Sequence, residues 1–309
     1  MPVNQNPFLP MQSAASKSGP TPLERVSRLP IWKGAVAPER LGGGITNINF
    51  VVADGGERYV VRVGDDIPIH QVMRFNEAAA SKAAFAAGLS PEVTYAEPGI
   101  MVLRFVDGMT CTAADIRDPA RLDRIVQLLR RVHRDMPKHL RGPLLTFWVF
   151  HVIRDYAHTL AEGASRHAPR LPALLEAAAD LEKAVGPIEL VFGHNDLLPA
   201  NFIDDGARVW LIDWDYAGFN TALFDLANLA SNAELGAEAE RGLLAAYYGD
   251  PPDAALLRRY QAMKCASLLR EAMWSMVSEI HSTLAFDYAA YTQDYLGRFE
   301  RALAARGDA

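Results

Sequence analysis

The most informative segment of the sequence is Gly193-His194-Asn195-Asp196-Leu197-Leu198-Pro199-Ala200-Asn201, which fits the pattern H-x-D-x-x-x-x-N. An aspartate at the start of a tight loop can accept the proton of an attacking hydroxyl group. An asparagine five residues later can turn back toward Mg²⁺, and Asp213, after the next apolar run, can bind the ion from the other side. Phosphoryl transfer depends on positioning and charge neutralisation, so the pattern predicts a phosphotransfer site.

Aspartate and asparagine also favour ordinary turns, so the segment has a second interpretation as a loop without chemistry. Two apolar runs, 188–192 and 209–212, flank it and are predicted to be strands. Asp213 follows the second run directly, at the end of a predicted strand–loop–strand unit. Because this aspartate stands where the chemistry requires it, we favour the phosphotransfer site.

The sequence on either side of this unit predicts two lobes of different character. Residues 1–22 are rich in Pro, Ser, Asn and Gln and are predicted to be a disordered leader. Residues 23–106 are predicted to form an N-terminal lobe, and residues 107–309 a larger, mainly helical lobe. The helices of the larger lobe are expected from about Asp118 onward and near 147–163, 171–185, 224–248 and 253–303.

The N-terminal lobe is predicted to contain a small antiparallel sheet that begins at about Leu41. Residues 49–52 and 58–63 flank Asp54-Gly55-Gly56, which is a hairpin signal. An Ala-rich helix is expected over 71–88, closed by a glycine, and a second strand pair follows around 93–95 and 100–103.

Composition and charge narrow the classes of function. The 309 residues are 50% apolar and 22% charged, the balance of an ordinary globular protein, and a net charge of −6 argues against nucleic-acid binding. No apolar run approaches the roughly 20 residues of a membrane span, and the N-terminus lacks a secretion signal. Cys111 and Cys265 are too few for a disulfide framework, so we expect a protein of the reducing cytoplasm.

Residues 193–201 resemble the phosphotransferase loop of the choline/ethanolamine kinase and aminoglycoside phosphotransferase families, which are distant relatives of protein kinases. The resemblance covers about 30–302. It implies an α+β, protein-kinase-like bilobal fold, with a small N-terminal sheet carrying one helix and a larger helical lobe. It also implies ATP and Mg²⁺ as cofactors.

The resemblance assigns a separate role to each member of the motif. Asp196 would be the catalytic base, and Asn201 and Asp213 would be the Mg²⁺ ligands. His194 would brace the loop and carry no proton. Asp225 resembles a family position that supports the catalytic loop from a helix, so it is expected to be structural as well.

A glycine-rich segment, Leu41-Gly42-Gly43-Gly44-Ile45-Thr46-Asn47, joins the first two predicted strands. Glycine permits close backbone approach, and the N–H groups of Gly43 and Gly44 can hold phosphate oxygens. The segment departs from G-x-G-x-x-G and, taken alone, also fits an ordinary flexible turn. It resembles the phosphate-covering loop of the family, with Thr46 and Asn47 at its tip.

Arg62 closes the strand 59–62, where protein kinases place a lysine and choline-kinase-like proteins tolerate arginine. Glu77 on the next helix would fix the direction of the guanidinium group, which would hold the α- and β-phosphates of ATP. The alternative is a surface salt bridge, which contributes little. Adenine is expected at the crossing between the lobes, 103–106, which includes Phe105.

A cationic amino alcohol as phosphate acceptor would need aromatic faces and carboxylates. Asp215 and Tyr216 stand beside the predicted metal ligand, and the segments around Trp274 and Tyr288 resemble the choline pocket of choline kinases. We therefore predict these four residues as substrate contacts. The alternative for both aromatic residues in the C-terminal helices is core packing, because apolar residues around them recur at helical spacing.

Two departures from the choline kinase pattern leave the acceptor open. Choline kinases place a second tryptophan where this chain has Glu271, and an acidic residue where this chain has Asn232. The leading hypothesis is a kinase for a small amino alcohol such as choline or ethanolamine. The alternatives are an aminoglycoside or other small-molecule kinase, and a catalytically silent nucleotide-binding pseudokinase. A metal hydrolase is disfavoured, since no second histidine ligand motif is present.

Overall fold

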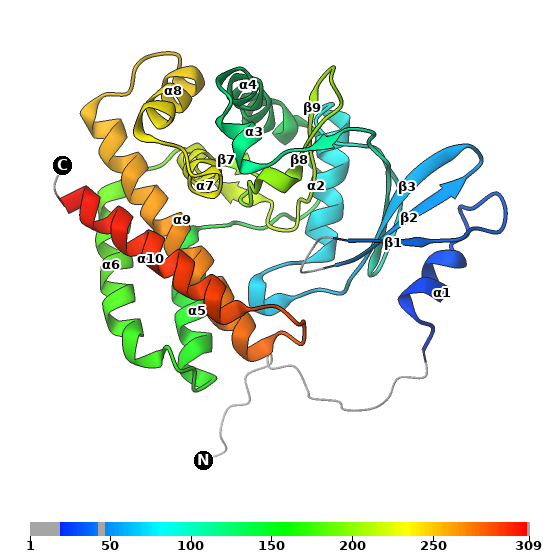
Figure 1. Ribbon diagram of the computed structural model, residues 1–309, viewed down its shortest axis with the longest axis horizontal. Coiled ribbons are helices and arrows are strands. Elements are labelled where there is room, and N and C mark those ends of the chain that lie inside the picture. Colours follow the sequence, from blue (N-terminus) through cyan, green and yellow to red (C-terminus); the bar gives the residue numbers. More distant parts are fainter. Residues whose placement is uncertain (1–18, 43–46, 308–309) are drawn as a thin grey trace.

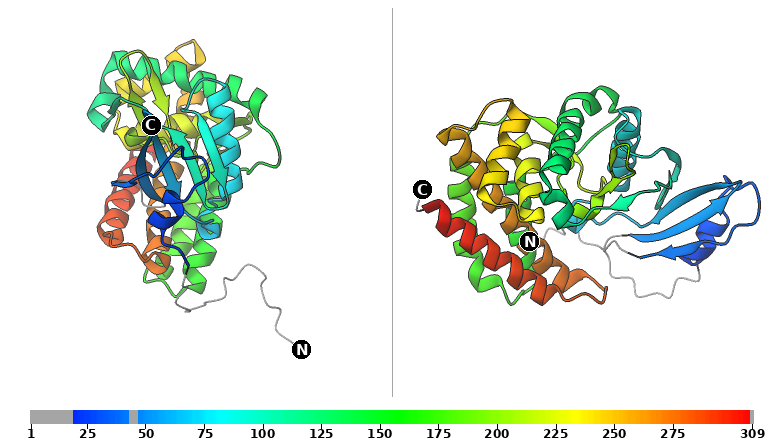
Figure 2. Two further views of the ribbon diagram at one scale, coloured as in Figure 1. Left: turned by 90° about the vertical axis from the view of Figure 1, so that its right-hand side faces the viewer. Right: turned by 45° about the horizontal axis from the view of Figure 1, so that its top comes forward.

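The computed structural model describes residues 19–42 and 47–307. A small antiparallel sheet lies at one end and a larger, mostly helical region at the other (Figure 1), and two further views show the sheet standing to one side of the helices (Figure 2). The predicted α+β fold class is confirmed. Most of the predicted leader, 1–22, lies outside the described residues. We keep 23–106 and 107–309 as proposed lobes.

Within the described residues, the sheet contains five strands in the order β1-β2-β3-β5-β4, and every neighbouring pair is antiparallel. This order confirms the predicted succession of strands and helix. The strands are β1 (Glu39–Leu41), β2 (Ile48–Asp54), β3 (Glu57–Val63), β4 (Val93–Glu97) and β5 (Ile100–Arg104).

The turn between β2 and β3 sets the register of the sheet. Gly55 and Gly56 have φ angles of +59° and +82°. A two-residue turn with both residues at positive φ matches the twist of the flanking strands, and glycine adopts it without strain. The resulting register places Arg62 opposite Asn49 on β2 and opposite Met101 on β5. The turn thus fixes the position of the predicted phosphate-binding arginine.

Two helices accompany the sheet, whereas the sequence predicted one. The unpredicted helix α1 (Pro22–Ser27) buries Val26 in a small core with residues of β2, β3 and β5. Its capping box, formed by Thr21 and Glu24, is a signal that the sequence did contain. The predicted helix α2 (Arg74–Ala86) buries its alanines in the main core and lies between the sheet and the helical region (Figure 1).

The helical region packs around one large core, at whose centre α9 contacts α5, α6, α7 and α10. Its helices are α3 (Ala113–Arg117), α4 (Pro119–Asp135), α5 (Val149–Glu162), α6 (Leu171–Val185), α7 (Ala222–Ala233), α8 (Ala237–Tyr248), α9 (Ala254–His281) and α10 (Tyr288–Gly307). Short 3₁₀ helices lie at Pro68–His70, Met136–His139, Ala168–Arg170 and Pro199–Asn201. None of the helices in 19–42 and 47–307 is both long and apolar enough to cross a membrane.

The long helices predicted over 224–248 and 253–303 are each divided in two. Glu234 adopts a left-handed conformation, with φ at +53°, and ends the first helix of the former pair. A loop over 282–287 separates α9 from α10. Helical spacing continues across both breaks, so periodicity alone could not reveal them.

The segment around the motif pairs differently from the prediction. β7 (Val191–Gly193) pairs with β10 (Gly218–Asn220). β9 (Val209–Leu211) pairs instead with β8 (Phe202–Asp204), which also pairs with β6 (Met109–Thr110). The prediction of a single strand–loop–strand unit is therefore wrong, because the two apolar runs belong to separate small sheets. Strands of two or three residues are too short to show a period.

Candidate active site

The predicted catalytic loop follows β7, and the side chain of Asp225 on α7 holds its first residues. Its carboxylate accepts hydrogen bonds from the backbone N–H groups of His194, at 2.9 Å, and Asn195, at 2.8 Å. His133 Nε2 lies 2.9 Å from the same carboxylate. Burial acts to raise the pKa of Asp225, but the hydrogen bond and charge of His133 outweigh it and lower the pKa. Asp225 thus occupies the position that the predicted bracing role requires.

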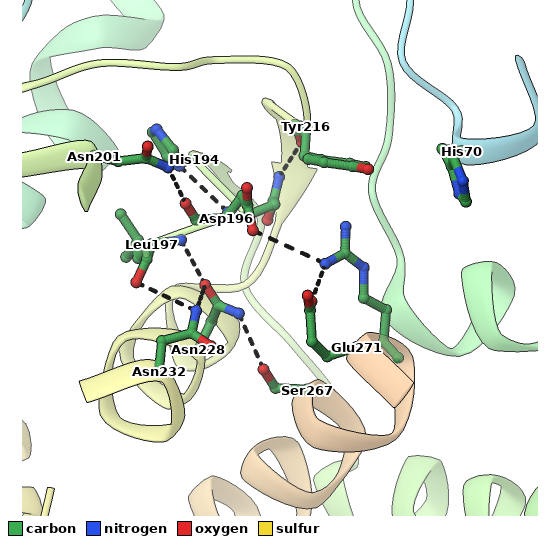
Figure 3. A network of polar contacts seen from close by, with 12 residues as sticks. His70, His194, Asp196, Leu197, Asn201, Tyr216, Asn228, Asn232, Ser267 and Glu271 are labelled. Carbon is green, nitrogen blue, oxygen red and sulfur yellow. Dashed lines mark hydrogen bonds and ion pairs between the residues drawn. The ribbon is translucent and has the colours of Figure 1, made fainter. Parts of the chain in front are cut away.

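Asparagines of α7 hold the middle of the loop (Figure 3). The backbone N–H of Leu197 donates to Asn228 Oδ1 at 2.6 Å, and Asn232 Nδ2 donates to the Leu197 carbonyl at 3.3 Å. Asn228 Nδ2 in turn donates to Ser267 Oγ on α9, at 3.1 Å. Asn232, which stands where choline kinases carry an acidic residue, therefore contacts the loop backbone.

His194 links the loop to the residue that precedes Asp213. Its buried ring donates from Nε2 to the carbonyl of Ile212, at 2.9 Å, and its Nδ1 lies 3.3 Å from the backbone N–H of Asp196. Burial lowers the pKa of His194. With one nitrogen donating and the other accepting, the ring is neutral. This arrangement suits a bracing residue better than a proton carrier.

Asp196 lies where the loop meets α9. Its side chain is 15% exposed, and its Oδ1 is 4.0 Å from Nη1 of Arg270. Burial raises the pKa of Asp196 well above its ordinary value, although the charge of Arg270 opposes the shift. Asn201 Nδ2 donates to the Asp196 backbone carbonyl at 2.8 Å, so its amide oxygen is the atom left for a cation.

Arg62 joins three carboxylates at the other side of the loop. Its Nε lies 2.9 Å from Glu77, and its Nη2 lies 2.7 Å from Asp213 and 2.8 Å from Asp215. The Arg62 side chain is only 10% exposed, so the alternative of a surface salt bridge is wrong. In the described part of the chain, oxygens of these three carboxylates lie within 4.8 Å of one another, an arrangement that could hold a metal ion.

Arg74 completes this group of charges. Its Nη1 lies 2.7 Å from Glu77 and 2.9 Å from Asp215. Burial raises the pKa of Glu77 to about 7, against the opposing charge of Arg62. Arg74 was not predicted as a site residue from the sequence, although its place three residues before Glu77 on a helix was a signal for a salt bridge.

A cleft with a cavity of about 360 Å³ lies between the sheet and the predicted catalytic loop. Residues predicted to contact nucleotide or metal come together along its wall: Arg62, Glu77, Phe105, Asn201 and Asp213. The predicted phosphate-binding residues Gly43, Gly44 and Thr46 lie outside the described residues. Asn47 is described, and its Nδ2 donates to Asp215 at 3.2 Å.

The predicted acceptor residues divide into two groups. Asp215 belongs with the arginines, whereas Trp274 and Tyr288 form a buried aromatic group with ring centroids 6.1 Å apart. Tyr291 joins them, 6.0 Å from Trp274, and its hydroxyl donates to Glu271 at 2.8 Å. A carboxylate therefore stands beside aromatic faces, the combination expected of a site for an organic cation.

The fourth predicted acceptor residue, Tyr216, is buried beneath Arg270, whose guanidinium carbon lies 4.4 Å from the ring centroid. Arg270 also pairs with Glu271, at 2.6 Å between Nη1 and Oε2. Arg270 was not predicted as a site residue from the sequence. Its signal was the charged pair Arg270-Glu271 inside a largely apolar stretch of helix, because charges are rarely buried without a partner.

Comparisons with known proteins place the chain in a family. Residues 39–238 match the family model for choline/ethanolamine kinase. The chain is 27% identical to protein LicA of Haemophilus influenzae over 258 residues, 80% of this chain and 75% of that protein. It is also 27% identical to mouse ethanolamine kinase 2 over 299 residues, 85% of this chain and 75% of that one.

Solved structures share the fold. A choline/ethanolamine kinase family protein from Mesorhizobium loti superposes with a TM-score of 0.71 at 27% identity, covering 91% of this chain and 96% of that one. The choline kinase LicA from Streptococcus pneumoniae gives a TM-score of 0.73 at 23% identity, covering 87% and 94%. A thermostable mutant of aminoglycoside phosphotransferase APH(4)-Ia gives a lower TM-score of 0.62 at 20% identity, covering 87% of this chain and 95% of that one.

The chain is a small-molecule kinase with a protein-kinase-like fold, the fold that these solved structures share. The chain belongs to the choline/ethanolamine kinase family, because the family model matches 200 of its 309 residues, 39–238. The predicted resemblance is confirmed.

Proposed function

We propose that this kinase uses ATP and Mg²⁺ to phosphorylate the hydroxyl group of a small amino alcohol such as choline or ethanolamine. The observation that carries the proposal is the position of the loop between two sites. Asn201 and Asp213 line the same cleft as Arg62, while Asp196 faces Arg270, whose partner Glu271 contacts the aromatic group through Tyr291. Family membership supports the choice of acceptor.

The cleft suits a nucleotide for reasons of shape and charge. Its wall over 103–106 belongs to β5 and the chain that leaves it, and offers apolar surface for a base. Arg62 would hold the phosphates, and the contact of Glu77 with its Nε would fix the plane of the guanidinium group. The relative LicA has been solved with AMP, which supports an adenine nucleotide.

The oxygen atoms around the cleft fit Mg²⁺, which prefers carboxylate and amide oxygens. Asp213 is the most accessible member of its carboxylate group, with a side chain 26% exposed against 4% for Glu77 and 4% for Asp215. Asn201 presents its amide oxygen, because its nitrogen is bonded to the Asp196 carbonyl. Asp213 and Asn201 would therefore hold the ion, which supplies charge neutralisation for the phosphate oxygens when bound.

Asp196 would act as the general base. It would take the proton of the acceptor hydroxyl as that oxygen attacks the γ-phosphorus and the bond to ADP breaks. The pKa of Asp196 is raised by burial, so its carboxylate is a stronger base than an exposed aspartate. The neutral ring of His194 keeps the loop in place without competing for this proton.

The amine of the acceptor would lie beside Glu271, among Trp274, Tyr288 and Tyr291. The Glu271 carboxylate already accepts from Tyr291 and pairs with Arg270, and a carboxylate has further lone pairs for an ammonium group. Aromatic faces attract a desolvated cation, which supports an amino alcohol over a neutral sugar.

The test is an acceptor panel with purified full-length enzyme, Mg²⁺ and γ-labelled ATP. The panel contains choline, ethanolamine and their N-methyl intermediates, together with aminoglycosides and simple sugars. We expect label transfer to one or more amino alcohols, and none without Mg²⁺. Transfer only to an aminoglycoside or a sugar would replace the proposed acceptor class. ATP·Mg²⁺ binding without transfer to any compound would favour the silent pseudokinase.

A further inference from the structure

Arg62 is paired with the carboxylate that the proposed function gives to Mg²⁺. Its Nη2 lies 2.7 Å from Asp213 Oδ1, and its side chain is 10% exposed, against 26% for Asp213. Within residues 19–42 and 47–307, Arg62 is the one ion-pair partner of Asp213. A divalent cation bound at this oxygen would therefore lie close to a guanidinium group. Like charges so close together repel strongly in a partly buried site.

The three carboxylates around Arg62 differ in the partners that remain when this arginine moves. Glu77 and Asp215 each have a second cationic partner, because Nη1 of Arg74 lies 2.7 Å from the former and 2.9 Å from the latter. Asp213 has no such second partner in the described part of the chain. Movement of Arg62 thus leaves two carboxylates paired with Arg74 and makes Asp213 available to a metal ion.

The backbone around Asp213 is held in place. Asp213 has a φ angle of +69°, in the left-handed region that an aspartate adopts at a cost unless its surroundings enforce it. The backbone N–H of Ile212 donates to the Asn201 carbonyl at 2.9 Å, and the Ile212 carbonyl accepts from His194 Nε2 at 2.9 Å. The longer side chain of Arg62 is therefore the member of the pair that can move.

The guanidinium group of Arg62 can turn toward the cleft without losing its other contact. Its Nε lies 2.9 Å from Glu77, so Nη2 can swing while this contact remains. Arg62 and Asp213 line the same cavity of about 360 Å³. Phosphate oxygens form charge-assisted, often bidentate hydrogen bonds with guanidinium groups. Phosphate groups that enter the cleft would therefore compete with Asp213 for Nη2.

We infer that Arg62 and the divalent cation exchange places on Asp213. Arg62 holds the carboxylate until phosphate groups draw its Nη2 away, so Asp213 binds the cation tightly only together with the nucleotide. The inference rests on the proposed function and adds a coupling between the two ligands of the cleft. By linkage, each ligand raises the affinity of the site for the other. Arg62 is thus a phosphate-binding residue and also the group that opposes binding of the metal ion alone.

The experiment titrates the full-length enzyme with Mn²⁺ alone, without nucleotide or acceptor, and follows free Mn²⁺ by electron paramagnetic resonance. Mn²⁺ takes the same oxygen ligands as Mg²⁺. Arg62→Met removes the competing charge, and we expect it to bind Mn²⁺ at least about tenfold more tightly than the wild type. The double variant Arg62→Met/Asp213→Asn should return to the weak binding of the wild type, because the oxygen that Arg62 releases is then missing.

Arg124→Met is the matched control. Nη1 of Arg124 lies 2.9 Å from Asp204, a buried carboxylate that does not line the cleft. Its Mn²⁺ affinity is expected to equal that of the wild type. Circular dichroism checks that each variant is folded. Arg62→Gln keeps hydrogen-bond donors for the carboxylates and replaces Arg62→Met if the latter does not fold, with the same gain in Mn²⁺ affinity expected.

Two results overturn the inference. One is an Arg62 variant that binds Mn²⁺ no more than about twofold more tightly than the wild type. The other is a double variant that binds as tightly as Arg62→Met, since the ion would then lie elsewhere. A merely structural role of Arg62 would lower the affinities for both Mn²⁺ and ATP·Mg²⁺, whereas the exchange raises the first and lowers the second.

Failure of the proposed function has a different signature. It would appear as no phosphate transfer to any compound of the acceptor panel. The Mn²⁺ titration contains neither acceptor nor nucleotide, so its result stands apart from that outcome and still decides whether Arg62 opposes metal binding at Asp213.

Discussion

Replacing Asp225 by asparagine tests how the catalytic loop is held. The Asp225 carboxylate is 1% exposed and accepts from two backbone N–H groups, at 2.9 and 2.8 Å, with His133 at 2.9 Å. Asparagine keeps the shape but removes the charge, and its amide nitrogen faces a donor at one of these contacts. Hydrogen bonds to a charged group contribute about 1.5–3 kcal/mol each. Removing one partner from a buried charge pair costs about 3–5 kcal/mol.

We therefore expect Asp225→Asn to lower the free energy of unfolding by about 3–5 kcal/mol, a large part of a typical total of about 5–15 kcal/mol. Urea unfolding followed by circular dichroism measures the loss as a lower midpoint with an unchanged slope. Hydrogen–deuterium exchange of the peptide over 191–198 should show faster exchange, because the backbone N–H of either His194 or Asn195 loses its acceptor. The control is Asp180→Asn on an exposed face of α6, expected to change stability by less than about 0.5 kcal/mol.

A loss below about 1 kcal/mol would refute the reasoning, because a net hydrogen bond between neutral groups already contributes that much. Unchanged exchange over 191–198 would refute it independently. It would mean that the loop keeps its conformation without the Asp225 carboxylate.

Further predictions concern the arginine cluster, a tight backbone contact, acid stability and the acceptor pocket. Arg62→Met leaves three carboxylates without their common cation, so calorimetry should show an ATP·Mg²⁺ affinity at least about tenfold lower than that of the wild type. An affinity within about twofold of the wild-type value would contradict the phosphate-binding role of Arg62. Gly218→Ala places a Cβ 2.9 Å from the Leu145 carbonyl oxygen and should cost about 1–3 kcal/mol in urea unfolding, whereas Gly236→Ala meets open space and should cost less. Asp225 has a pKa below its ordinary value of 3.8, so the stabilisation that its carboxylate provides is present above that pH and is lost as the pH falls. Asp225→Asn should remove this part of the pH dependence of the free energy of unfolding. Parallel curves of unfolding free energy against pH for the variant and the wild type would contradict the prediction. Trp274→Phe should raise the KM for the acceptor several-fold and leave the KM for ATP unchanged. A KM for the acceptor equal to that of the wild type would indicate that Trp274 contributes only to core packing.

The sequence predicted the elements that periodicity and turn chemistry define. The hairpin around Gly55-Gly56, helix α2 and the helical character of the larger region were found in this way. The H-x-D-x-x-x-x-N spacing marked a loop whose members do contact one another, because they lie within one short stretch of chain. Arg62 and Glu77 could be paired because one closes a strand and the other begins the helix that follows it.

Contacts that depend on long-range packing could not be predicted in the same way. β7 pairs with β10 across the motif, and strands of three residues carry no recognisable period. Arg270 meets Asp196 only because α9 crosses the core beside the loop. Asp215, which stays a predicted substrate contact, also forms ion pairs with Arg62 and Arg74, and pairs between residues so far apart in the sequence could not be predicted from spacing.

The central claim is that Asp196 takes the proton of the acceptor hydroxyl. The most direct measurement is the single-turnover rate of phosphate transfer for Asp196→Asn, made with the best acceptor of the panel and with ATP·Mg²⁺ affinity measured alongside. General base catalysis contributes about 10²- to 10⁴-fold, so the rate should fall by that factor while ATP·Mg²⁺ affinity stays within about twofold. A variant that binds ATP·Mg²⁺ and transfers phosphate within about threefold of the wild-type rate would contradict the claim.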